Sequence, residues 1–121
     1  PGADREVGVD FERLEVWRRS KDLSVEVYRG LASCLDYGFR NQLTRSGLSV
    51  PSNIAEGMER SSDAEKTYFL NVAKGSCAEL RTQLLIGKEI GYLDAALADR
   101  WITEARELSM MLTGLIKRVS K

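Results

Sequence analysis

Apolar side chains recur about every 3.6 residues along most of the chain, the spacing that places them on one face of an α-helix. The first series predicts a helix over about 12–35. Its apolar line consists of Leu14, Trp17, Leu23, Val27, Leu31 and Cys34. A second series predicts a helix over about 39–58. Because Pro51 removes one backbone hydrogen bond inside this series, we expect the helix to kink there or to begin again at Ser52.

Local motifs mark where the third and fourth helices begin. Ser62 followed by Glu65 is a capping box, in which the hydroxyl accepts from the Glu65 amide and the carboxylate accepts from the Ser62 amide. The third helix is predicted over 63–90, and Gly91 stands where a left-handed C-terminal cap is expected. Asp94 is predicted to cap a fourth helix that continues toward the end of the chain.

Four long helices with short connections predict an all-α fold, an antiparallel up-down-up-down four-helix bundle. No segment shows the alternation of polar and apolar residues that favours a β-strand. Residues 11–121 are expected to form this single domain. Residues 1–10, which carry few sizeable apolar side chains, are expected to form a flexible N-terminal arm.

The predicted turn near 60–62 sets which residues of the second and third helices face each other. In this register Arg45 faces Glu79, and the two are expected to form an inter-helix ion pair. Five polar residues are expected to face the bundle interior: Arg45, Asn53, Glu56, Ser76 and Glu79. Together with Pro51 and Gly57, we interpret them as a structural motif that maintains the fold.

The amino-acid composition limits which kinds of binding and catalytic site the chain can form. The chain has 18 Lys and Arg against 18 Asp and Glu, so any nucleic-acid binding must come from a local patch. It has no His, which excludes Ser-His-Asp and Cys-His nucleophile pairs, Glu-x-x-His di-iron helices and Cys/His zinc fingers. We therefore expect no enzyme activity, no metal and no cofactor.

The two cysteines and the short apolar runs indicate in which cellular compartment the protein is expected. Cys34 and Cys77 lie in apolar helical segments, which predicts reduced and buried packing residues. No apolar run approaches the roughly 20 residues that span a bilayer, and no export signal is visible. We expect a cytoplasmic protein that does not enter a membrane.

Basic residues cluster at both ends of the predicted domain. The candidate nucleic-acid-binding residues are Arg18, Arg19, Lys21, Lys117, Arg118 and Lys121. In an up-down bundle the start of the first helix and the end of the fourth lie at the same end, so the two groups can merge into one phosphate-contacting patch. A solvated charged surface is the alternative. The aromatic residues exceed what a slim core can hide, which predicts a subunit interface.

The segment from Gln42 to Gly57, with its N-I-A-E-G core, resembles the hallmark segment of a bacterial four-helix-bundle family encoded in intervening sequences of 23S ribosomal RNA genes. Further similar segments begin at Phe11, Gly75 and Gly91, so the resemblance covers about 11–118. It implies a four-helix bundle that assembles into a homo-pentameric ring. It also implies kinship with accessory variability determinants of diversity-generating retroelements, which bind nucleic acid through a positively charged surface and partner a reverse transcriptase.

Two functions follow as expectations. The first is a non-enzymatic, oligomeric scaffold or adaptor that binds structured RNA or other nucleic acid through its outer basic residues. The alternative is a protein-interaction module that recruits a partner such as a reverse transcriptase, without binding nucleic acid by itself. RNA binding at low ionic strength and protein capture after nuclease treatment distinguish the two.

Overall fold

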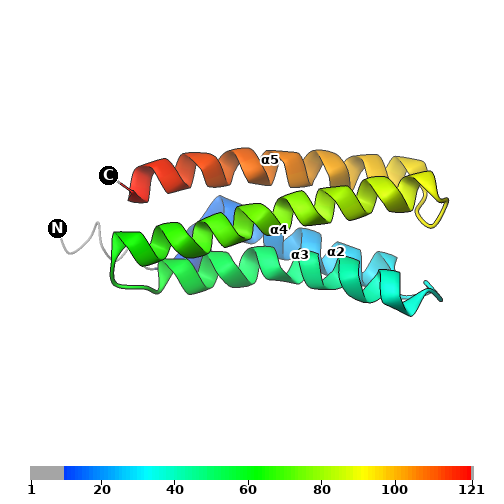
Figure 1. Cartoon of the computed structure of the whole chain (residues 1–121), viewed down its shortest axis with the longest axis horizontal. Helices are drawn as coiled ribbons and strands as arrows, with labels where there is room; N and C mark the ends of the chain where they lie inside the picture. The colour runs from blue at the N-terminus through cyan, green and yellow to red at the C-terminus, as the bar shows by residue number, and fades with distance from the viewer. Residues whose placement is uncertain (1–9, 121) are drawn as a thin grey trace.

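The computed structural model describes residues 10–120 and is an antiparallel four-helix bundle, as the sequence predicts (Figure 1). A 3-10 turn, η1 (Phe11–Arg13), precedes the long helices. These are α2 (Glu15–Gly30), α3 (Tyr37–Met58), α4 (Asp63–Glu89) and α5 (Ala95–Val119). Each helix runs opposite to the one before it, so α2 begins and α5 ends at the same end of the bundle (Figure 1).

The first helix is shorter at both ends than its apolar series predicts. Leu14 has an extended backbone, with ψ of 129°, and separates η1 from α2. At the other end α2 stops at Gly30, against the indole of Trp101, and 31–36 form the turn into α3. Apolar spacing continues through both breaks because these residues still face the core.

The third and fourth helices begin at the predicted caps. The Ser62 hydroxyl accepts from the Glu65 amide at 3.1 Å. The Glu65 carboxylate accepts from the Ser62 hydroxyl at 3.2 Å, where we expected it to accept from the Ser62 amide. Asp94 accepts from the amide of Leu97 at 3.0 Å, and Gly91 has the expected positive φ of 80°. These caps are confirmed because they depend on local chemistry.

Pro51 lies inside α3, which continues through it, so the helix does not begin again at Ser52. The proline is buried, and the helix is held on both sides by packing. Tertiary burial therefore outweighs the loss of one backbone hydrogen bond. At the start of α3 the Asp36 carboxylate accepts from the Phe39 amide at 3.0 Å.

The core is a continuous column of aliphatic side chains with one large aromatic residue, Trp101, which is only 2% exposed. Fully buried members come from every long helix and include Val27, Leu43, Ile54, Leu70, Leu80, Leu84, Leu108 and Leu112. Cys77 belongs to this core, and burial raises the pKa of its thiol to about 12. Cys34 is half-buried, and both thiols are free, so the expectation of burial is confirmed for Cys77 alone.

Each residue of α3 faces a residue of α4 that lies one position later in the chain than the predicted register places it. The hydroxyls of Ser49 and Ser76 are 2.8 Å apart, and the Gln83 amide donates to the Gln42 side chain at 3.4 Å. Small hydroxyl side chains take the interior positions as a result. Ser76 is 7% exposed, and Asn53 is half-buried, where it donates to the Ser49 hydroxyl at 2.9 Å.

The expectation that Arg45, Glu56 and Glu79 face the interior is therefore wrong, because all three are exposed. Arg45 and Glu79 form no ion pair in the described part of the chain. Glu56 pairs with Arg60 of the following turn. The buried line of α3 runs through Leu43, Val50 and Ile54, and Arg45 lies off this line.

Candidate nucleic-acid interface

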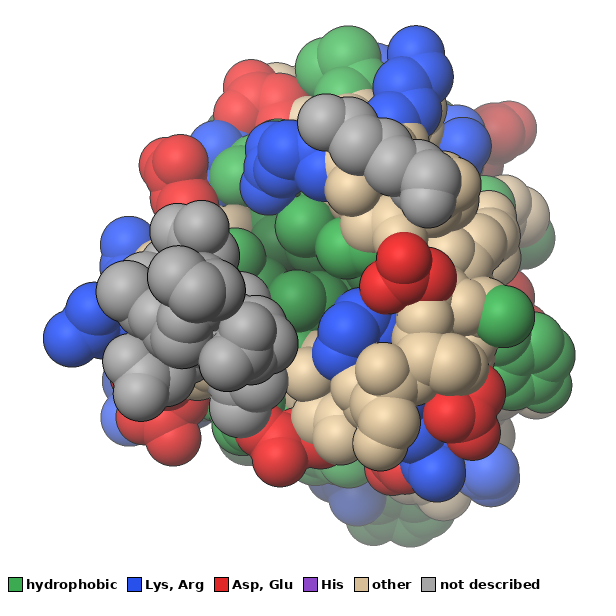
Figure 2. Space-filling model, turned by 90° about the vertical axis from the view of Figure 1, so that its left-hand side faces the viewer, with side chains coloured by type: hydrophobic (Ala, Val, Ile, Leu, Met, Phe, Trp, Pro, Cys, Tyr) green, Lys and Arg blue, Asp and Glu red, His purple; other side chains and the backbone are tan. Residues whose placement is uncertain are grey.

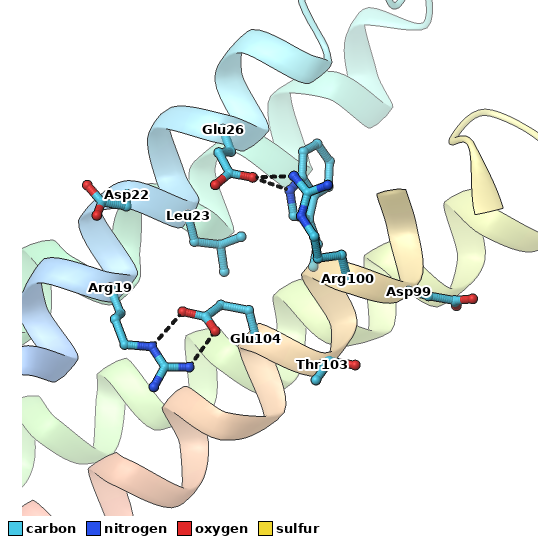
Figure 3. Close-up of a pocket in the computed structure, with 9 residues that line it drawn as sticks. Arg19, Asp22, Leu23, Glu26, Asp99, Arg100, Thr103 and Glu104 are labelled. Atoms are coloured by element: carbon cyan, nitrogen blue, oxygen red, sulfur yellow. Dashed lines mark hydrogen bonds and ion pairs between the residues drawn. The ribbon is translucent and has the colours of Figure 1, made fainter. Parts of the chain in front are cut away.

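The predicted basic residues of α2 do not form one group of free cations. Arg19 turns toward α5, where its guanidinium donates to Glu104 at 2.8 and 2.5 Å (Figure 3). It also pairs with Glu107. These hydrogen bonds, first of all those with Glu104, raise the pKa of Arg19 above its ordinary value. Arg19 therefore serves as a link between α2 and α5, and its charge is compensated within the fold.

The other predicted cations divide into paired and unpaired residues. Lys21 pairs with Asp22 at 2.9 Å. Arg18 donates to the backbone oxygen of Arg13 at 2.9 Å and closes the η1 turn. Lys117 and Arg118 are exposed near the end of α5, and Lys121 lies outside the described residues. Phosphate binding by these residues stays a prediction.

The end of the bundle where α2 begins and α5 ends carries both signs of charge. Figure 2 views this end, and shows Lys and Arg side chains together with Asp and Glu around a hollow that is lined by hydrophobic side chains. The two basic groups do lie at the same end, as predicted (Figure 1). Acidic side chains are present on this end as well, so it is not a uniform cation patch.

A cavity of about 610 Å³ lies between α2 and α5 (Figure 3). Glu26 is its central acceptor, because it accepts from the buried Trp101 indole at 3.0 Å and from Arg100 at 2.8 Å. The bond from Trp101, followed by the bond from Arg100, lowers the pKa of Glu26. Sequence reasoning missed these contacts, since Glu26 and Trp101 are 75 positions apart. Ion pairs between Arg and Glu side chains cross the cavity and hold α2 and α5 together.

The seam between α4 and α5 carries one paired cation and further cations that have no acidic partner among residues 10–120. Lys88 pairs with Asp99 at 2.7 Å, which fixes how the two antiparallel helices face each other. Counting seven residues, or about 10.5 Å, from this pair along each helix places Arg81 of α4 opposite Arg106 of α5. Arg106 is exposed and Arg81 is half-buried, and neither forms an ion pair among residues 10–120.

Two lysines extend this row. Lys74 precedes Arg81 by seven residues and therefore lies on the same face of α4. Lys117 lies on the side of α5 that faces α4, eleven residues after Arg106. Neither lysine forms an ion pair within the described chain. We refer to Lys74, Arg81, Arg106 and Lys117 as the cation seam, of which sequence reasoning had singled out only Lys117.

A polar recess of about 520 Å³ lies on the other side of α4, between α3 and α4. Its lining is composed of hydrogen-bonding and small residues: Gly38, Asn41, Gln42, Arg45, Ser46, Ser49 and Glu79. Two of the motif residues, Arg45 and Glu79, thus share one recess although they do not pair. We refer to it as the α3–α4 recess.

No group of three or more His, Cys, Asp or Glu side chains in residues 10–120 is placed to hold a metal ion. None of the described helices is long and apolar enough to cross a membrane.

The fold defines the class: a small all-α protein built as an antiparallel four-helix bundle. The family described as 23S rRNA-intervening sequence protein matches residues 12–114, and the chain belongs to this family. A similar solved structure is a protein of unknown function from the S23 ribosomal protein family of Bacteroides thetaiotaomicron, at 24% identity and a TM-score of 0.79. The match covers 84% of this chain and 98% of that one. No curated protein matches this chain.

Proposed function

We propose that this protein is a non-catalytic scaffold that binds structured RNA through the cation seam. The observation that supports this most is that neither Arg81 nor Arg106, which face each other when counted from the Lys88–Asp99 pair, has an ion-pair partner among the described residues. Two cations that face each other across a helix interface repel each other. An anionic ligand between them removes this repulsion.

Phosphate is the anion that suits this arrangement. An Arg guanidinium contacts phosphate through two parallel hydrogen bonds, and Lys adds a point charge. Lys74 and Lys117 extend the row along the seam, so a polyanion fits it better than a single small anion. RNA is the polyanion we propose, because the family description refers to 23S rRNA.

The test compares the loss of two positive charges in two places. The double variant Arg81→Gln with Arg106→Gln neutralises the seam, and Lys21→Gln with Arg100→Gln removes two charges that are already paired with Asp22 and Glu26. In a mobility-shift assay with structured ribosomal RNA at low ionic strength, we expect the seam variant to bind at least tenfold more weakly and the control to change about twofold or less. Equal losses, or no shift by the unaltered protein, would contradict the proposal.

A second candidate function is supported by the opposite end of the bundle. There Leu35 is 81% exposed, Tyr37 57% and Ile90 53%, and Tyr92 joins the two turns through a hydrogen bond of 3.1 Å to Asp36. Exposed apolar clusters favour contacts with other proteins. We propose that they mediate self-association into the homo-oligomer that the family resemblance implies. Recruitment of another protein, such as a reverse transcriptase, is the alternative use of the same surface.

Self-association and recruitment of another protein predict different results for a variant of the apolar end. Leu35→Ser and Tyr37→Ser leave the buried core intact and remove apolar surface. If the end mediates self-association, the double variant has a lower solution mass by light scattering than the unaltered chain. If it recruits another protein, the mass stays the same and capture of that protein after nuclease treatment is lost.

A further inference from the structure

The α3–α4 recess contains one cation and one anion that do not neutralise each other. Arg45 and Glu79 both line it, both are exposed, and no ion pair joins them within the described residues. Exposed side chains of this kind contribute little to the free energy of unfolding. Their placement in a common recess is therefore more informative about a ligand than about stability.

The remaining lining of the recess limits which ligand fits. Asn41 and Gln42 offer amide groups that both donate and accept, and Ser49 offers a hydroxyl. Arg45 can only donate, and an ionised Glu79 can only accept. The ligand must therefore present an acceptor edge to Arg45 and N–H donors to Glu79. The volume of about 520 Å³ is in the range of small-molecule sites.

We propose that the α3–α4 recess binds an unpaired guanine base of the RNA, an inference that rests on the proposed function. Guanine offers O6 and N7 as two acceptors for a guanidinium. Its N1–H and N2–H₂ groups are adjacent donors, which a carboxylate such as Glu79 accepts through both oxygens. Adenine, cytosine and uracil lack this donor pair. Sequence-specific proteins read RNA mainly at unpaired bases with exposed edges.

The position of the recess relative to the cation seam supports one continuous RNA path. Both surfaces border α4 on opposite sides, so one helix diameter, about 10 Å, separates them. The solvent-facing side of α4 between them carries Gly75 and Ala78, which are exposed and small. A Cβ atom added at Gly75 has no neighbour within 4 Å. An RNA strand can therefore cross α4 close to its backbone, with phosphates in the seam and a base in the recess.

The experiment uses four RNA hairpins that differ only in one loop base, together with free guanosine 5′-monophosphate. The unaltered protein is expected to bind the hairpin with guanine about tenfold more tightly than the other three, the discrimination of one bidentate contact. Glu79→Gln is expected to remove this preference and to leave affinity for the adenine hairpin unchanged. Glu89→Gln, the same change at an exposed carboxylate near the end of α4, is the control and keeps the preference.

The outcomes separate this inference from the proposed function. If the seam variant weakens binding to all four hairpins equally while the guanine preference persists, both hold. Equal affinity for the four hairpins, with binding still dependent on the seam, overturns the guanine site alone. If no hairpin binds at low ionic strength, the proposed function fails, and titration with guanosine 5′-monophosphate decides the inference. Absence of NMR shifts at Arg45 and Glu79 then overturns it, and shifts that are lost in Glu79→Gln support it.

Discussion

Arg19 and Arg81 are the same residue on similar helices, and their surroundings give them different roles. Arg19 lies opposite Glu104 and Glu107 and links two helices. Arg81 faces Arg106 when counted from the Lys88–Asp99 pair, and it has no acidic partner among the described residues. Whether a basic residue is free to bind phosphate therefore depends on the residues that face it from the neighbouring helix. The number of basic residues in its own segment does not decide this.

At the same scale, Glu26 predicts a pH dependence of stability. Its pKa lies below the ordinary value of 4.5, so its ionised form stabilises the fold fully above pH 4.5, and this stabilisation is lost as the pH falls through the lower folded value. Glu26→Gln is expected to cost about 0.5–1 kcal/mol at neutral pH, because the carboxylate is half-exposed and screened by solvent. Thermal melts of both proteins across pH should converge at low pH. A constant difference across the range contradicts this role.

Because Arg45 and Glu79 are exposed, we expect their replacement to have little effect on the free energy of unfolding. Because neither is buried and they form no ion pair in the described chain, Arg45→Ala and Glu79→Ala should each change the free energy of unfolding by about 0.5 kcal/mol or less. The double variant should equal the sum of the single variants. Urea unfolding of the four proteins measures this. A coupling energy well above 0.5 kcal/mol would restore the structural interpretation of the pair.

At the scale of the helices, replacement of glycine by alanine is expected to have opposite effects on stability at two positions. A Cβ atom at Gly30 would lie 2.5 Å from the buried Trp101 ring, so Gly30→Ala is expected to destabilise the fold by about 1–3 kcal/mol. At Gly75 the space is open, and Gly75→Ala is expected to stabilise α4 by up to about 1 kcal/mol. Thermal melts therefore shift in opposite directions. A stabilised Gly30→Ala protein would show that α2 and α5 do not approach closely there.

The elements also show how far sequence reasoning reaches. The caps at Ser62, Gly91 and Asp94 could be predicted because their chemistry is contained in a few neighbouring residues. The end of α2 could not, because it depends on contact between Gly30 and Trp101, far away in the sequence. For the same reason the register of α3 on α4 differs by one residue from the prediction, and Ser49, rather than Arg45, makes the contact with α4.

At the scale of the whole molecule, the candidate surfaces depend on how helices pair. The spacing of Lys74 and Arg81 is visible in the sequence, but their meeting with Arg106 becomes visible only when the pairing of Lys88 and Asp99 fixes the register. We expect light scattering to give a mass several times 13.5 kDa, because the apolar end of the bundle is exposed. A monomer at all concentrations would contradict self-association.

Contact between the cations of α4 and α5 and RNA phosphates is tested most directly by the salt dependence of RNA binding. The affinity of the unaltered protein for structured ribosomal RNA should fall linearly on a logarithmic plot against salt concentration. Removing two phosphate contacts with Arg81→Gln and Arg106→Gln should reduce that slope by about 1.5. The same slope for both proteins would contradict the claim, because the seam would then release no counterions.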